Sequence, residues 1–162
     1  MTKKISLENK SNIFIADVIQ KLEYYCSYQE RCHVEVRDKL KQFNLTSLEK
    51  DTVIVHLIDQ NFLNEERFAQ IFTISKFHQK GWGKKRISNE LKARHISSYL
   101  INNALKTIPE EEYEMMFIAL VEKQWNSLTD TDLFKKRKKC CDFLLRKGWE
   151  SDKVYDQVMR LN

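Results

Sequence analysis

The sequence predicts an all-α protein made of three tandem three-helix repeats, with about nine helices in total. The first observation is a shortage of turn formers, because the 162 residues include three glycines, one proline and no Asn-Gly or Asp-Gly pair. A β-rich fold needs many tight turns and therefore more of both residues. The second is an apolar periodicity of three to four residues, which favours helices packed on a core. The third is self-similarity at intervals of about fifty residues, which is typical of stacked helical units.

We expect the repeats to occupy residues 12–63, 64–108 and 109–162. Segments 36–47, 87–98 and 141–151 align with offsets of 51 and then 53 residues, and each is expected to contain the end of one helix and the start of the next. Three sets of residues coincide: Val36, Ile87 and Cys140; Leu40, Leu91 and Leu144; and Leu45, Ile96 and Trp149. The first two sets lie four residues apart, on one face of a helix. The third set follows a break and precedes residues that start helices: Thr46 with Glu49 as a capping box, and Ser97 or Ser98 and Ser151 as N-caps. Each segment therefore predicts a helix, a tight turn and a new helix.

Each repeat also begins with a longer helix. In the first repeat we expect it at about residues 14–28, with one apolar face made of Ile15, Val18, Ile19 and Leu22. In the second repeat it follows the N-cap Asn64, and its register is Phe68, Ile71, Phe72 and Ser75. In the third repeat Pro109 and three glutamates form a favourable first turn. That helix is expected to bury Tyr113, Met116, Phe117, Leu120 and Val121.

The net charge of +5 comes from the middle of the chain, where residues 61–108 carry nine basic and three acidic side chains. Two basic triplets, 84–86 and 137–139, are related by the repeat offset of 53 residues. Cations at a helix start oppose the helix dipole, which costs about 0.3–1 kcal/mol each. We expect the first triplet to be exposed, either as a solvated face or as a contact for nucleic acid or an acidic protein. The predicted contact residues for such a partner, an acidic protein surface or DNA phosphates, are Lys76, Lys80, Trp82, Lys84, Lys85, Arg86, Lys92, Arg94, Arg137, Lys138 and Lys139. For Trp82 we favour packing on its own repeat over stacking on a partner.

Known catalytic and cofactor motifs are absent from the sequence. It has no P-loop, glycine-rich dinucleotide turn, H-E-x-x-H or G-x-S-x-G motif, and its four histidines are scattered. The four cysteines form no C-x-x-C pair, and we expect reduced thiols packed as small hydrophobes rather than metal ligands. No apolar run approaches the eighteen or so residues that span a bilayer, and the amino-terminal lysines precede no apolar segment. We therefore predict a cytoplasmic protein that is not an enzyme and has no metal or cofactor.

Two segments resemble a known family. Residues 62–69, FLNEERFA, are similar to its junction between the first two repeats, and residues 80–91, KGWGKKRISNEL, are similar to its Lys-Gly-x-Gly, basic, Ile, Glu-Leu signature. In this order and separation the two motifs resemble RecX regulatory proteins, and the similarity extends over about residues 17–161. The chain departs from the pattern at Asn61-Phe62, where glycine-leucine is usual, and at His95, where glycine is common.

The resemblance implies a regulator of the RecA recombinase in homologous recombination, DNA repair and the SOS response. RecX proteins bind RecA filaments on single-stranded DNA, lie in the filament groove and mostly inhibit recombinase, ATPase and coprotease activity. The family fold is a curved, elongated set of three helical repeats, and we expect a monomer. One alternative is a helical-repeat module that binds single- or double-stranded DNA weakly. We expect such binding to lack sequence specificity, because the candidate recognition helix, residues 98–106, is hardly basic and poorly equipped to contact DNA. Another is a helical scaffold for a different protein.

Overall fold

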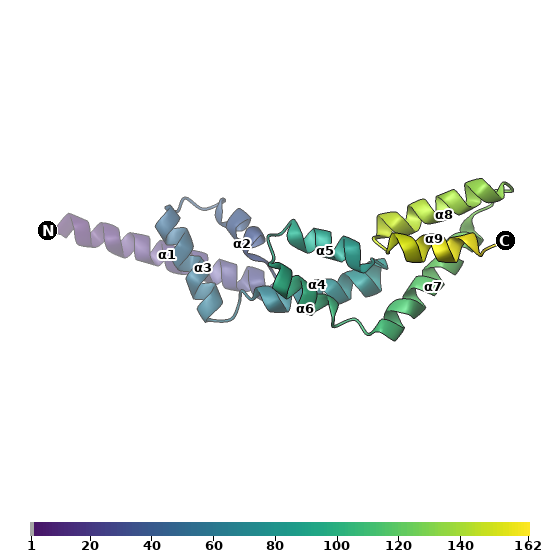
Figure 1. Ribbon diagram of the computed structural model, residues 1–162. Coiled ribbons are helices and arrows are strands. Elements are labelled where there is room, and N and C mark those ends of the chain that lie inside the picture. Colours follow the sequence, from purple (N-terminus) through teal and green to yellow (C-terminus); the bar gives the residue numbers. More distant parts are fainter. Residues whose placement is uncertain (1) are drawn as a thin grey trace. The chain divides into compact units, whose positions relative to one another are not determined.

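We describe residues 2–162 from a computed structural model, with side chains from residue 14 onward. Over these residues the chain forms nine α-helices and no strand, which confirms the predicted all-α fold (Figure 1). The helices are α1 (Thr2–Tyr28), α2 (His33–Leu40), α3 (Ser47–Asp59), α4 (Glu65–Lys80), α5 (Lys84–Lys92), α6 (Ser98–Leu105), α7 (Glu110–Ser127), α8 (Leu133–Lys147) and α9 (Ser151–Met159). None of the described helices is long and apolar enough to span a membrane. The prediction that the first residues are not an export signal concerns residues whose side chains lie outside the described part of the chain.

The predicted repeat register is confirmed. All nine aligned core residues are buried: Val36, Ile87, Cys140, Leu40, Leu91, Leu144, Leu45, Ile96 and Trp149. Thr46 and Glu49 form the expected capping box of α3, and the Ser97 hydroxyl accepts from the Leu100 N–H at the start of α6. At the start of α9 the N-cap is Glu150 instead of Ser151. The turns before α3 and α6 are therefore capped as the sequence predicts, and the turn before α9 is capped one residue earlier.

The chain divides into two compact units, Met1–Phe68 and Ala69–Asn162, and the boundary falls within α4. In the first unit α3 packs against both α1 and α2. The core there includes Val18 and Leu22 from α1, Val36 from α2, and Val53 and Leu57 from α3. The predicted limits of the individual repeats, at 63/64 and 108/109, stay predictions.

The second unit contains most of α4 and all of α5 to α9. α5 packs on α6, and α8 packs on both α7 and α9. Aromatic rings link the last two repeats, because Tyr113 lies 5.9 Å from Phe77 and 4.5 Å from Trp149 between ring centroids. Phe117 adds a third contact, at 5.2 Å from the Trp149 ring. These stacked rings fix the turn after α4 next to the turn after α8, and that arrangement builds the surface described below.

The predicted apolar register of α4 is wrong at Ile71, which is exposed. The buried residues of α4 are Phe68, Ala69, Thr73 and Phe77. Ala69, Thr73 and Phe77 are spaced four residues apart and therefore lie on one face of the helix. Apolar side chains surround this helix on several faces, so periodicity alone could not select the buried one. In α7 the predicted Tyr113, Phe117 and Val121 are buried, whereas Met116 and Leu120 are only partly so. The first helix begins at Thr2 rather than near residue 14.

Candidate partner-binding surface

The turn after α4 and the turn after α8 touch through their backbones, and we call this contact the joint. The Gly83 N–H donates to the Lys147 carbonyl at 2.8 Å, and the Lys85 N–H donates to the Gly148 carbonyl at 3.2 Å. A Cβ on Gly83 would lie 2.4 Å from the Gly148 oxygen. The second glycine of the Lys-Gly-x-Gly signature is thus required by close backbone approach.

Two buried aromatic side chains complete the joint. The Trp149 Nε1–H donates to the Gly81 carbonyl at 3.2 Å. The Tyr113 hydroxyl accepts from the Lys84 N–H at 3.0 Å and donates to the Glu150 carboxylate, with 2.9 Å to Oε2. Burial raises the pKa of Tyr113 well above its ordinary value, so the hydroxyl keeps its proton and remains a donor.

The Lys84 side chain packs within the joint and is only partly exposed to solvent. Its Nζ lies 2.8 Å from the Glu110 carboxylate and 4.2 Å from the centroid of the Tyr113 ring. The expectation that residues 84–86 are all exposed is therefore wrong at Lys84, which is half-buried, and also at Arg86, which donates from Nη1 to the Arg146 carbonyl at 2.9 Å. The Arg86 side chain holds the two turns together, whereas the Lys84 side chain connects the start of α5 to α7. Of the triplet, Lys85 alone is exposed.

Trp82 packs on its own repeat. Its ring centroid lies 6.4 Å from that of Phe72 and 4.2 Å from the Arg86 guanidinium carbon. Lys76 Nζ lies 5.7 Å from the same ring, and the Arg94 guanidinium carbon lies 4.9 Å from the Phe72 ring. Trp82 stays partly exposed. The structure thus brings four of the predicted residues, with Phe72, into one cation–aromatic cluster: Lys76, Trp82, Arg86 and Arg94.

Several predicted contact residues are neutralised within the chain. Arg94 pairs with Glu90 at 2.9 Å, Lys138 with Asp142 at 2.8 Å, and Lys139 with Asp130 at 2.7 Å. Arg137 donates from Nη2 to the Leu161 carbonyl at 2.7 Å. The second triplet, 137–139, is therefore engaged inside the third repeat. Among the described residues, Lys80, Lys85 and Lys92 are exposed predicted cations that make no ion pair with an acid.

Sequence reasoning missed two cations of the third repeat that lie at the joint: Arg146 and Lys147. Lys147 Nζ donates to the Lys80 carbonyl. Burial first, and then the charges of Arg86, Lys80 and Lys123, lower the pKa of Lys147. The signal was in the sequence, because the tripeptide Lys-Gly-Trp occurs twice, at 80–82 and 147–149, and Gly81 and Gly148 both have positive φ. These are the two turns that meet.

A hollow of about 560 Å³ opens beside the joint. Its lining combines three cations, an amide, a carboxylate and a hydroxyl, from Lys85, Arg86, Arg146, Asn89, Glu90 and Ser151. Glu90 is already paired with Arg94, so the charge of this hollow is positive. We call the cationic area around it the joint surface; it comprises the exposed Lys80, Lys85 and Arg146 and the partly buried Arg86 and Lys147.

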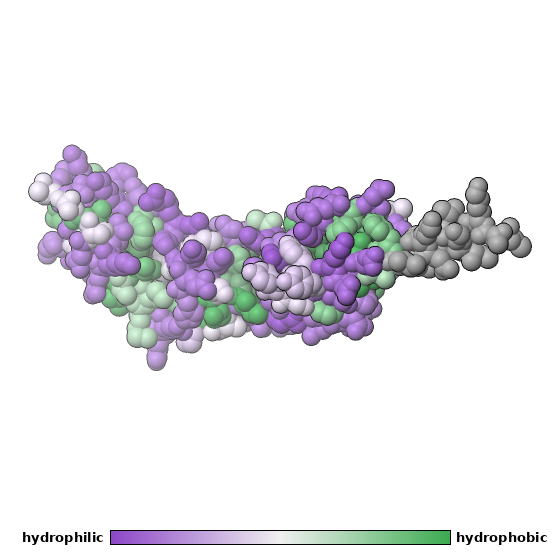
Figure 2. All heavy atoms as spheres, turned by 180° about the vertical axis from the view of Figure 1, so that it is seen from behind, coloured by the Kyte–Doolittle hydropathy of each residue, from purple (hydrophilic) through white to green (hydrophobic). Residues whose placement is uncertain are grey.

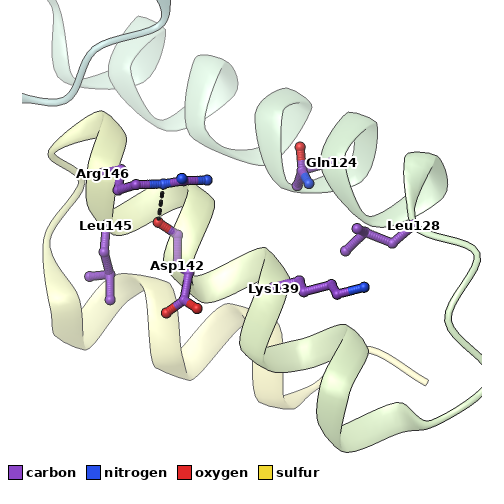
Figure 3. A pocket seen from close by; sticks show the side chains of 6 residues that line it. All are labelled: Gln124, Leu128, Lys139, Asp142, Leu145 and Arg146. Carbon is purple, nitrogen blue, oxygen red and sulfur yellow. Dashed lines mark hydrogen bonds between the residues drawn. The ribbon is translucent and has the colours of Figure 1, made fainter.

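A second hollow, of about 710 Å³, lies between α7 and α8 (Figure 3). Its charged groups are already engaged within the chain: the Arg146 Nε–H donates to the Asp142 carbonyl at 3.2 Å, Lys139 pairs with Asp130, and the Asp142 carboxylate pairs with Lys138. Gln124, Leu128 and Leu145 complete the lining. These side chains hold α8 in place, and neither a thiol nor an imidazole lies among them.

The cysteines Cys26, Cys32, Cys140 and Cys141 are all buried and free. Burial raises the pKa of Cys26 and of Cys140 to about 11, so these thiols are protonated at neutral pH. Within the part of the chain that the structure describes, no group of three or more His, Cys, Asp or Glu side chains is arranged to hold a metal ion.

Known proteins match this chain in sequence and in fold. The family model of the second three-helix domain of RecX matches residues 64–105, and that of the third matches residues 110–157. The regulatory protein RecX of Clostridium botulinum (strain Eklund 17B / Type B) is 33% identical over 129 residues, which are 76% of this chain and 58% of that protein. RecX of Bacillus cytotoxicus is 24% identical over 148 residues, which are 89% of this chain and 55% of that protein. The chain thus spans little more than half the length of these relatives.

Two crystal structures have the same fold. RecX from Lactobacillus salivarius superposes with a TM-score of 0.76 at 25% identity, covering 90% of this chain and 94% of that one. Another structure of a regulatory protein RecX superposes with a TM-score of 0.79 at 20% identity, covering 91% of this chain and 73% of that one. The resemblance drawn from residues 62–69 and 80–91 is confirmed.

Proposed function

The chain belongs to the RecX family of regulatory proteins, and from that premise we propose that it binds RecA filaments on single-stranded DNA in the cytoplasm. Bound as a monomer in the filament groove, it mostly inhibits the recombinase, ATPase and coprotease activities of RecA. It does so by occupying the groove and catalyses no reaction of its own. Its roles are then in homologous recombination, DNA repair and the SOS response.

The observation that carries the proposal is the convergence of cations at the joint surface. Lys80, Arg86 and Lys147 come together from two repeats: the Lys147 ammonium donates to the Lys80 carbonyl, and burial, followed by the charges of Arg86 and Lys80, lowers the pKa of Lys147. Like charges held together destabilise the isolated protein, and an anionic partner reverses that effect. An acidic protein surface or a phosphate backbone supplies such a partner, and a RecA filament on DNA presents both kinds of chemistry.

The sharpest test reverses one charge that has no role in the fold. Lys85 is exposed, lies in the first turn of α5 and makes no ion pair with a described acid. We expect Lys85→Glu to raise the concentration needed for half-maximal inhibition of the RecA ATPase by roughly ten-fold, about 1.4 kcal/mol. A triple reversal of residues 84–86 is less informative, because Lys84 and Arg86 also make contacts within the chain.

Lys135→Glu is the matched control. Lys135 is also an exposed lysine without an ion pair among the described residues, and it also lies in the first turn of a helix, α8. Both variants change the net charge equally, and circular dichroism checks that both stay folded. If Lys85→Glu inhibits as well as the unchanged protein does, the joint surface is not the contact.

The alternative function is weak DNA binding without sequence specificity, which the same cations favour. Phosphate contacts release counterions, so affinity for single-stranded DNA without RecA would fall steeply with salt concentration. Anisotropy titrations at several salt concentrations, with and without RecA, separate the two functions. Our proposal requires much tighter binding to the RecA filament than to bare DNA, and equal affinities would favour the alternative.

A further inference from the structure

A groove on the third repeat is distinct from the joint surface. It runs along α8 and α9, which pack side by side (Figure 1), and has a volume of about 630 Å³. The buried Cys141 lies at its base. Its other lining residues are Leu133, Phe134, Arg137, Lys138, Asp142, Tyr155 and Met159. None of them belongs to the joint surface.

Four large apolar side chains of this groove are exposed to solvent. Leu133, Phe134, Tyr155 and Met159 are 40 to 76% exposed, and Phe134 is the most exposed of them. Single exposed apolar residues are common on protein surfaces, and apolar areas do lie scattered among polar ones on the face seen in Figure 2. Four such residues around one groove form a patch, and such patches mark binding sites.

One positive charge at the groove, that of Arg137, is not neutralised by an acidic side chain among the described residues. Asp142 neutralises Lys138, at 2.8 Å. Arg137, in contrast, donates from Nε and Nη2 to the Leu161 carbonyl, which carries no charge. Because its acceptor is neutral, Arg137 keeps its positive charge. A guanidinium has five N–H donors, so Arg137 also has donors left to bind a carboxylate.

We propose that this groove binds a short acidic segment of a partner protein. Apolar side chains of the segment pack on Phe134, Tyr155 and Met159, and one of its carboxylates pairs with Arg137. A second copy of this chain is a poorer occupant, because a two-fold contact through this groove would bring two identical, positively charged grooves together. This surface goes beyond the proposed function, since it needs no DNA and shares no residue with the joint surface.

Two synthetic peptides of about four helical turns test the groove. Both repeat leucine at every third or fourth position, and the remaining positions are glutamate in one and lysine in the other. Titrated into the ¹⁵N-labelled full chain, the glutamate peptide is expected to shift amide signals of α8 and α9 and to bind at least about ten-fold more tightly than the lysine peptide.

Variants connect the binding to named side chains. Phe134→Ser should weaken binding of the glutamate peptide by about ten-fold or more, and Arg137→Gln should reduce the preference for glutamate over lysine. Ile118→Ser is the matched control, because Ile118 is an exposed apolar residue of α7 outside the groove. Equal binding of both peptides, or no effect of Phe134→Ser, overturns the proposal. Concentration-dependent dimerisation in sedimentation that Phe134→Ser abolishes also overturns it, in favour of a second copy.

Discussion

At the scale of single residues, the hydroxyl of Tyr113 determines how firmly the second and third repeats are joined. It accepts the Lys84 N–H at 3.0 Å and donates to Glu150, and Tyr113 itself is buried. Removal of the oxygen leaves the Lys84 amide without that acceptor. We expect Tyr113→Phe to lower the free energy of unfolding by about 1–3 kcal/mol, measured by urea denaturation.

The same substitution at an exposed tyrosine controls for the chemistry. Tyr99 is 73% exposed, and Tyr99→Phe should change the free energy of unfolding by less than about 0.5 kcal/mol. Equal stabilities of the Tyr113→Phe and Tyr99→Phe proteins would show that the hydroxyl does not hold the joint. The glycines of the joint act differently, since a Cβ on Gly83 or Gly148 would meet backbone atoms that cannot move aside.

At the scale of helices, the capping box of α3 makes stability depend on pH. The Glu49 carboxylate accepts from the Thr46 N–H at 2.7 Å and from its hydroxyl at 2.8 Å, and the backbone hydrogen bond is the main cause that lowers the pKa of Glu49 below 4.5. A lowered pKa means that the contribution is present above pH 4.5 and lost as the pH falls through the folded value. We expect Glu49→Gln to be less stable than the unchanged protein at neutral pH.

The difference should shrink as the solution is acidified below pH 4.5, because the carboxyl of the unchanged protein then becomes neutral as well. Thermal unfolding at a series of pH values measures it. Glu122→Gln is the control, since Glu122 is exposed and lies in α7 beyond its first turn. A difference for Glu49→Gln that stays constant with pH would contradict the role of its charge.

Helices and turns could be predicted from the sequence because their signals are local. Apolar residues four positions apart, a capping box and a proline before glutamates each depend on a few neighbouring residues. The register of α4 was missed at Ile71 because only packing selects among several apolar faces. The cations were predicted as a set, but pairs such as Lys84–Glu110 join different repeats. Local sequence therefore identifies the charges, whereas the fold decides which of them remain for a partner.

At the scale of the whole molecule, the cysteines allow the unfolding of each compact unit to be measured separately. Cys26 and Cys32 lie in the unit Met1–Phe68, and Cys140 and Cys141 lie in the unit Ala69–Asn162. All four are buried, so a thiol reagent reaches them only when their own unit opens. Labelling at increasing urea concentrations, followed by peptide mass spectrometry, therefore gives an unfolding midpoint for each unit.

A matched pair of core variants then asks whether the units unfold independently. Leu22 and Leu144 are both fully buried, one in each unit, and replacement of either by alanine should destabilise its own unit by about 2–5 kcal/mol. We expect Leu22→Ala to bring the labelling of Cys26 and Cys32 to lower urea and to leave that of Cys140 and Cys141 unchanged, with the reverse for Leu144→Ala. Because α4 crosses the boundary, the opposite result has a clear meaning. If each variant shifts all four cysteines together, α4 couples the units into one cooperative fold.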